Sequence, residues 1–165
     1  MVSIIIPVLN EEKTIQKTQE NLSQLTGDYE VIFCDGGSDD RTVELIHPPF
    51  RVIAGERGRG VQMNRGAREA NGELLFFMHC DAVLEKDVLM KLPSDVKEGN
   101  AVGYLKIVFD STHWLMKVCG FMSNMRSAWR KIVFADQAFI LHSKSPQIPY
   151  PAPWGAPSGR HTDSP

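Results

Sequence analysis

Cysteines and long apolar runs are both scarce in this 165-residue sequence. Its three cysteines, Cys34, Cys80 and Cys119, form neither a CxxC pair nor an even-numbered disulfide framework. That pattern argues against a structural zinc site and favours a reducing compartment. No apolar run approaches the roughly 18 residues of a membrane-spanning helix, and the N-terminus lacks the charged region and cleavage site of a signal peptide. We therefore expect a cytoplasmic protein without a membrane span.

An excess of either charge is also missing. The chain carries 18 basic and 20 acidic residues, a net charge of −2, so nothing favours a nucleic-acid partner. The glycine pattern of a dinucleotide-binding dehydrogenase is absent too, because Gly55-x-x-Gly58-x-Gly60 is not GxGxxG and the first predicted strand is followed by no glycine. The remaining composition, 42% hydrophobic and 23% charged residues, is ordinary for one globular domain.

Apolar runs alternate with helical spacing through the first half of the chain. We predict strands at Val2–Val8, Glu30–Cys34, Arg51–Ala54 and Leu74–His79. Helices are predicted in the segment with Ile15, Leu22 and Leu25, at Thr42–Ile46 and at Val61–Ala70. Strands that alternate with helices are typical of an α/β fold with a mostly parallel sheet.

The second half is less regular. It contains strand-like stretches at Ala101–Phe109 and Ala138–Leu141, and an apolar helical stripe between Thr112 and Trp129. From Ser143 onward the chain is rich in proline, serine and glycine. We expect one folded domain over residues 1–142 and an irregular tail over residues 143–165.

Polar residues follow each of the four predicted N-terminal strands. They lie at Asn10–Glu12, Asp35–Asp40, Gly55–Arg59 and His79–Asp81. Ligands of an open parallel sheet bind outside the carboxyl ends of its strands, so these loops predict one shared pocket. The Asp35 carboxylate can accept hydrogen bonds from ribose hydroxyls or a base N–H, and the alternative is a helix-capping loop. We interpret Asp39 and Asp40 as capping residues.

His79 and Asp81 are candidate metal ligands. If the fourth strand continues to this point, their spacing of two residues puts both side chains on one face. Mg²⁺ or Mn²⁺ held there would neutralise a diphosphate and stabilise it as a leaving group, whereas the alternative is an aspartate that begins a turn. Four arginines lie near the third loop: Arg57, Arg59, Arg65 and Arg68. They could pair with phosphates or belong to a solvated helix face, and we favour the solvated face for Arg68.

Three motifs occur in order over residues 2–85: SIIIPVLNEEKTI, DGGSDDRT and GRGVQMNRGAREANGELLFFMHCDA. Together they resemble family 2 of the GT-A glycosyltransferases, and HCDA with the later FADQAFIL resembles its small soluble bacterial subgroup. The resemblance implies a GT-A (Rossmann-like) fold over residues 1–142. It also implies metal-assisted, inverting transfer of a sugar from a UDP- or GDP-linked donor to an unknown acceptor.

The resemblance also implies roles for individual residues. Pro7, Asn10 and Glu12 would border the base, Asp35 and Gly36 the base or ribose, and Arg59 and Asn64 the diphosphate. Asp81 would be the metal-linked carboxylate of the family's DxD motif. That motif reads His79-Cys80-Asp81 here, so a histidine stands where the first carboxylate is expected.

The chain departs from the family beyond Leu141, as an atypical or truncated C-terminal part would. After Asp136-Gln137 there is no glutamate, and the only later carboxylate is that of Asp163. Inverting transfer needs a base for the proton of the acceptor hydroxyl, and Asp136 is our candidate. The resemblance implies a Glu-Asp pair in this half, whose aspartate is the family's general base, and one alternative is a non-catalytic nucleotide-sugar-binding module that has lost it. Another is an interaction protein that docks through the stripe from Trp114 to Trp129, although core packing also explains the stripe. A short second half would leave apolar surface uncovered, which favours a homodimer.

Overall fold

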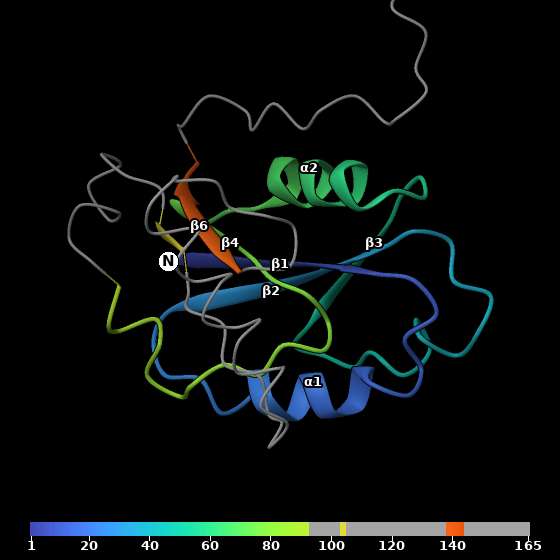
Figure 1. Ribbon diagram of the computed structural model, residues 1–165, viewed down its shortest axis with the longest axis horizontal. Helices are drawn as coiled ribbons and strands as arrows, with labels where there is room; N and C mark the ends of the chain where they lie inside the picture. The colour runs from blue at the N-terminus through green and yellow to red at the C-terminus, as the bar shows by residue number, and fades with distance from the viewer. Residues whose placement is uncertain (93–102, 105–137, 144–165) are drawn as a thin grey trace, which may run out of the picture.

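The protein is described here from a computed structural model that places residues 1–92, 103–104 and 138–143. Its elements follow in the order β1 (Val2–Val8), α1 (Ile15–Leu22), β2 (Tyr29–Asp35), β3 (Arg51–Ala54), α2 (Arg59–Glu69), β4 (Leu74–Phe77), β5 (Gly103–Tyr104) and β6 (Phe139–His142). The strands form one sheet in the order β3-β2-β1-β4-β6-β5. Helix α1 covers one face of this sheet and α2 covers the other (Figure 1).

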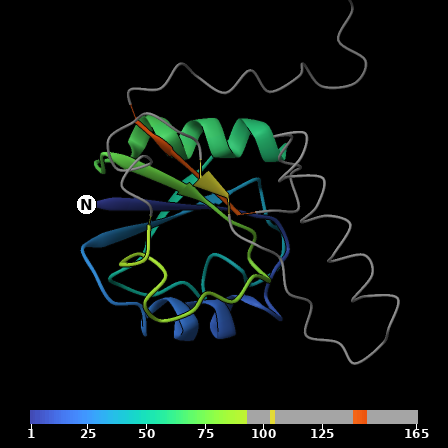
Figure 2. The ribbon, with the colours of Figure 1, turned by 60° about the vertical axis from the view of Figure 1, so that its left-hand side comes forward.

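The N-terminal four strands are parallel, and the last two are not. β1 pairs in parallel with β2 and β4, and β2 pairs in parallel with β3. β6 is antiparallel to both β4 and β5, and Figure 2 shows the orange β6 running alongside the green β4. The carboxyl ends of β1 to β4 therefore meet at one edge of the sheet, which agrees with the predicted α/β class.

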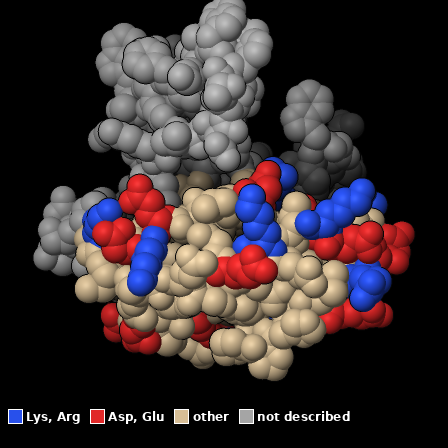
Figure 3. All heavy atoms as spheres, turned by 90° about the horizontal axis from the view of Figure 1, so that it is seen from below, with Lys and Arg blue, Asp and Glu red and all other residues tan. Residues whose placement is uncertain are grey.

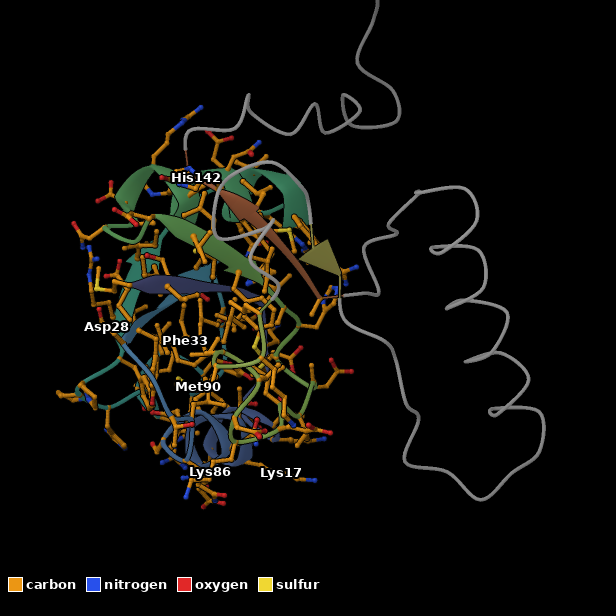
Figure 4. The ribbon with its side chains drawn as sticks, turned by 90° about the vertical axis from the view of Figure 1, so that its left-hand side faces the viewer. Lys17, Asp28, Phe33, Lys86, Met90 and His142 are labelled. Atoms are coloured by element: carbon orange, nitrogen blue, oxygen red, sulfur yellow. The ribbon has the colours of Figure 1, made fainter. Side chains whose placement is uncertain are left out.

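Both faces of the central strands are buried, which explains their continuous apolar runs. Ile4 and Phe33 belong to the core on the α1 side, and Figure 4 shows Phe33 between the sheet and α1. Ile5 belongs to the opposite core, together with Met63 of α2. Neighbouring residues of a strand point to opposite faces, so β1 supplies both cores.

Gly66 allows α2 to lie close to the sheet. A Cβ atom at this position would come within 2.4 Å of Ile5 Cγ2 and 2.6 Å of Cys34 Sγ. Real Cβ atoms do not approach other atoms so closely, so any larger residue would push the helix away from β1 and β2. The close contact holds α2 over the two strands whose ends lead into the candidate site.

Glu30 forms a hydrogen-bond network at the amino edge of the sheet, where the parallel strands begin. Its carboxylate accepts hydrogen bonds from Ser3 Oγ at 2.6 Å, Asn71 N at 2.6 Å and Arg51 Nη1 at 3.0 Å. Ser3 Oγ in turn accepts one from Gly72 N at 2.8 Å. These bonds join β1, the starts of β2 and β3, and the turn before β4, at the edge away from the candidate site.

The four N-terminal strands and the strand predicted at Ala138–Leu141 are confirmed with small changes in their bounds, and α1 and α2 confirm two of the predicted helices. The helix predicted at Thr42–Ile46 is wrong, because these residues form turns. Gln19 holds them in place: its Nε2 donates to Leu45 O at 2.8 Å and its Oε1 accepts from His47 N at 2.9 Å. A segment so short gains few helical hydrogen bonds, and tertiary contacts decide its conformation.

Several expectations fall outside the described residues. These include the helix at Thr112–Trp129, most of the strand at Ala101–Phe109, Asp136 and the tail beyond Ser143. The division into residues 1–142 and 143–165 stays a prediction.

Within the described part of the chain, α1 and α2 are both too short and too polar to cross a membrane. The outer face on the α1 side carries basic and acidic side chains close together around an uncharged area, without a continuous field of one sign (Figure 3).

Candidate functional site

The carboxyl ends of the parallel strands define the candidate site. From β1 the chain crosses by α1 to β2 on one side, whereas β4 lies on the other side of β1 and is reached by way of α2. The order of connections therefore reverses between β1 and β4, and such a switch point is where open α/β sheets bind ligands. The loops after β1 and β4 flank it, and the loop after β2 lies next to that of β1.

The loops after β1 and β2 are tied together by hydrogen bonds. Asn10 N donates to Ser38 Oγ at 3.0 Å, and Asp39 N donates to Asn10 Oδ1 at 3.0 Å. Glu12 N donates to Asp40 Oδ2 at 3.1 Å. Asn10 adopts a positive φ of 56°, a conformation that asparagine tolerates better than most residues. Asn10 and Glu12, two predicted base-bordering residues, thus belong to one preformed loop unit with residues 38–40.

Asp35 is the last residue of β2 and is buried. Its carboxylate accepts from Gly37 N at 3.0 Å, from Ser38 N at 3.2 Å and from Ser38 Oγ at 2.5 Å. Gly36, which lies between Asp35 and Gly37, donates its N–H to Val8 O at 3.0 Å. Asp35 therefore shapes its own loop, and its predicted contact with base or ribose stays a prediction.

Gln62 of α2 is a buried residue of the site that sequence analysis missed. Its Nε2 donates to Val8 O at 2.8 Å and to Cys34 O at 2.7 Å, near the ends of β1 and β2. A Cβ atom on Gly36 would lie 2.9 Å from this same Nε2. The sequence could have indicated this role, because Gln62 lies four positions before Gly66 and therefore on the same face of α2, the face that packs on the sheet.

The turn after β4 differs from the predicted geometry. β4 ends at Phe77, and Ala82 N donates to His79 O at 3.2 Å, which closes a turn. The expectation that His79 and Asp81 share one face of a strand is therefore wrong, because the strand has already ended. Asp81 is exposed and His79 is half-buried. Their assignment as metal ligands stays a prediction.

Glu11 and Asp81 approach the same buried thiol from different loops. Burial raises the pKa of Cys80, hydrogen bonds with Thr18 and Thr14 lower it, and the negative charges of Glu11 and Asp81 raise it again. The Glu11 carboxylate also accepts a hydrogen bond from the Thr14 hydroxyl. Sequence analysis passed over Glu11 in favour of Asn10 and Glu12, although the three are consecutive.

A cation at this position would need further ligands. Among the residues that the structure describes, no three His, Cys, Asp or Glu side chains come together as a metal site. The negative charge at Glu11 and Asp81 nonetheless suits a cation. Mg²⁺ is commonly held by one or two carboxylates together with water and phosphate oxygens, so a cation at this turn stays a prediction.

The other predicted residues in the described part of the chain lie on β1 and α2. Pro7 is in β1 opposite Cys34, Arg59 is the first residue of α2, and Asn64 is half-buried in the same helix. Arg68 is exposed in the last turn of α2, as expected for a solvated face. The proximity of Arg59 and Asn64 to a diphosphate stays a prediction, and Asp136 lies outside the described residues.

Comparison with known proteins gives matches over most of the chain. The sequence model described as glycosyl transferase family 2 matches residues 3–144. The glycosyltransferase YkcC of Bacillus subtilis is 30% identical over 114 residues, which cover 62% of this chain and 35% of YkcC. A PGL/p-HBAD biosynthesis glycosyltransferase of Mycobacterium bovis is 33% identical over 121 residues, covering 62% of this chain and 47% of the relative. The chain thus matches between a third and a half of the length of these relatives.

Solved structures show the same fold. The mannosyltransferase PcManGT of Pyrobaculum calidifontis, solved with GDP-Man and Mn²⁺, aligns with a TM-score of 0.58 at 22% identity, over 84% of this chain and 43% of that one. Glucosyl-3-phosphoglycerate synthase of Mycobacterium tuberculosis, solved with Mn²⁺, UDP and phosphoglyceric acid, aligns with a TM-score of 0.59 at 21% identity, over 87% and 56%. The GT-A fold predicted from the sequence is confirmed.

Proposed function

Since the chain belongs to glycosyl transferase family 2, we propose that it binds a nucleoside-diphosphate sugar at the carboxyl edge of its parallel sheet and transfers the sugar to an acceptor. The observation that carries the proposal is the convergence of three loops on this edge. The loops after β1 and β2 are joined by hydrogen bonds, and the turn after β4 lies across the switch point from them. Asp35 and Asp81 thereby come to the same end of the sheet.

The nucleotide would lie on the β1–β2 side of this edge. We propose that the preformed loop unit of Asn10, Glu12 and residues 38–40, with Asp35 and Gly36 next to it, receives the base and ribose beside Pro7. Arg59 and Asn64 would lie toward the diphosphate. The similar proteins of P. calidifontis and M. tuberculosis were solved with GDP-Man and UDP, and a similar Staphylococcus aureus protein, TarS, was solved with UDP-GlcNAc. Either UDP or GDP is therefore a reasonable nucleotide to test.

The metal would lie on the β4 side. Asp81 would hold Mg²⁺ or Mn²⁺ together with the diphosphate, and we propose His79 as a second ligand. The exposure of Asp81 and the neighbouring charge of Glu11 fit a cation that takes its other ligands from phosphate and water. When bound, such a cation supplies neutralisation of the charge that develops on the leaving nucleoside diphosphate.

The transfer itself would invert the anomeric carbon. The acceptor hydroxyl oxygen attacks that carbon from the face opposite the diphosphate, the bond from carbon to the diphosphate oxygen breaks, and a base takes the hydroxyl proton. We propose Asp136 as this base. The alternative is a module that binds the donor without transferring it, which is favoured by the absence of any glutamate after Asp136.

Titration calorimetry with UDP and GDP, each with and without Mn²⁺, tests the donor site. We expect one of them to bind with micromolar affinity in a metal-dependent way. Asp81→Asn should abolish the increase in nucleotide affinity that Mn²⁺ causes, whereas Asp87→Asn should leave that increase unchanged. Asp87 is a matched control, because it is an exposed aspartate of the same segment that pairs with Lys91 at 2.9 Å. A folded protein that binds neither nucleotide would refute the donor site.

The choice between transferase and binding module needs a product. A transferred sugar, detected by mass spectrometry with a panel of acceptors, would exclude the module, and Asp136→Asn should then abolish transfer while donor binding persists. The predicted homodimer is a separate proposal, which sedimentation velocity would test.

A further inference from the structure

The turn that carries Asp81 is attached to α1 on both sides of that residue. Before it, the Thr18 hydroxyl donates to the carbonyl of Cys80. After it, Asn21 Nδ2 donates to Leu84 O at 2.9 Å, and Leu84 N donates back to Asn21 Oδ1 at 2.8 Å. Figure 4 shows the continuation of this segment, with Lys86 and Met90, lying against α1. The position of Asp81 relative to the sheet thus depends on two side chains of a helix that precedes it by 60 residues and more.

These two side chains lie on a polar stripe that faces inward. Thr14, Thr18 and Asn21 follow the spacing of one helix face, and Thr18 is only 4% exposed. Burying polar groups destabilises a protein unless they are hydrogen-bonded. Leucine would be the expected residue on such a face if packing were its only role. Because the stripe is polar and pairs with the backbone of residues 80–84, it specifies where that segment lies.

Thr18 constrains Cys80 at two of its atoms. A hydroxyl has one proton to donate, and its nearest acceptor is the Cys80 carbonyl, while Thr14 O is a longer alternative at 3.1 Å. The Cys80 thiol lies 3.5 Å from the same hydroxyl oxygen, which can accept from it. The peptide group between Cys80 and Asp81 is planar, so the direction of the Cys80 carbonyl also sets the N–H and Cα of Asp81.

We propose that Thr18 and Asn21 are positioning residues for Asp81. This inference rests on the proposed function, in which the Asp81 carboxylate helps to bind a cation and a nucleoside diphosphate. Neither side chain touches the ligand. They fix the backbone before and after Asp81, so that the carboxylate is held at the switch point in the apo protein and needs no reorganisation when the cation binds.

The test compares variants that differ in one hydroxyl. Thr18→Val removes the hydroxyl and keeps the shape, and Thr18→Ser restores it. Thr26→Val is a matched control, because Thr26 Oγ1 donates to Lys86 O at 3.0 Å, further along the same segment. Ser3→Ala is a control for stability, since it removes a buried hydroxyl at the opposite edge of the sheet. The measurements are the Mn²⁺ concentration that half-saturates binding of UDP or GDP, and amide hydrogen exchange of residues 81–83.

We expect Thr18→Val to raise the half-saturating Mn²⁺ concentration about tenfold, the usual cost of removing an outer-shell partner. Exchange of residues 81–83 should become faster, while that of the central strands stays unchanged. Thr18→Ser, Thr26→Val and Ser3→Ala should keep the wild-type Mn²⁺ requirement, and Asn21→Leu should act like Thr18→Val.

Two results would overturn the inference. One is a Thr18→Val protein with wild-type exchange at residues 81–83, which would mean that Thr18 does not hold the turn. The other is a Ser3→Ala protein with the same increase in Mn²⁺ requirement, which would mean that lost stability, and not position, causes the effect. A wild-type protein that binds neither nucleotide would refute the proposed function instead, and the exchange measurement distinguishes the two failures.

Discussion

Replacement of Gln62 by leucine should be costly, although the two side chains are similar in size. Gln62 is 4% exposed, and its Nε2 donates to Val8 O at 2.8 Å and Cys34 O at 2.7 Å. Leucine fills the space and donates nothing. Both carbonyls belong to the paired ends of β1 and β2, so each keeps a backbone bond and loses only the one from Gln62; Val8 O, for example, keeps the bond from Gly36 N at 3.0 Å.

The expected loss follows from these two bonds. Each neutral hydrogen bond contributes about 1 kcal/mol net, and no carbonyl is left without a partner. We therefore expect Gln62→Leu to lower the free energy of unfolding by about 2 kcal/mol. For a chain of this size, that corresponds to a fall of about 4–8 °C in Tm.

Urea denaturation followed by circular dichroism would measure this loss. A lower midpoint with an unchanged m-value would show that stability has changed and not the compactness of either state. Gln16→Leu is the matched control: it makes the same substitution at an exposed position of α1 and should change the free energy by less than about 0.5 kcal/mol. If Gln62→Leu were as stable as Gln16→Leu, Gln62 would not link β1 and β2 in the way that the structure indicates.

Three further predictions concern the core and the amino edge. Gly66→Ala should lower the free energy of unfolding by about 1–3 kcal/mol in the same urea assay, because its Cβ would overlap Ile5 and Cys34; wild-type stability would contradict that close approach. Partial burial raises the pKa of Glu30, but hydrogen bonds from its neighbours outweigh this and bring the pKa below its ordinary 4.5. The contribution of Glu30 to stability is therefore present above pH 4.5 and lost as the pH falls through the lowered pKa. In Glu30→Gln, the midpoint of urea unfolding should fall less steeply with decreasing pH than in the wild-type protein. Burial raises the pKa of Cys34 to about 12, so iodoacetamide at pH 8 should leave this thiol unmodified until urea unfolds the protein, as mass spectrometry of its peptide would report.

The parallel half of the sheet could be predicted from the sequence because burial on both faces leaves a local signature. β1 has the predicted bounds, since its seven residues form an almost continuous apolar run with proline near its end. α2 was predicted at Val61–Ala70 and lies at Arg59–Glu69, so its bounds differ by one or two residues. The convergence of polar loops also followed from topology alone, because parallel strands bring their carboxyl ends to one edge.

The interior of the site could not be predicted in the same way. Gln62 and Thr18 act through hydrogen bonds to backbone carbonyls that are 28 to 62 residues away in sequence. No periodicity or motif reports such a bond, and each residue alone is an ordinary polar residue of a helix. The strand-face geometry of His79 and Asp81 failed for a related reason: an apolar run shows where a strand is favoured, but the turn that ends it is set by contacts with α1.

The described loops divide their polar groups between two tasks. On the β1–β2 side, Asn10 accepts a hydrogen bond from an amide of the neighbouring loop, and Asp35 accepts several from amides of its own loop. Much of their hydrogen-bonding capacity is therefore used in holding the loop after β2. On the β4 side, α1 holds the turn through the backbone of Cys80 and Leu84, and the carboxylate of Asp81 is left exposed. A base and ribose would therefore be recognised mainly by the shape and backbone of a preformed loop, since displacing its hydrogen bonds would be costly. Under the proposed function, a diphosphate and its cation would be recognised by charge, through the exposed carboxylate of Asp81.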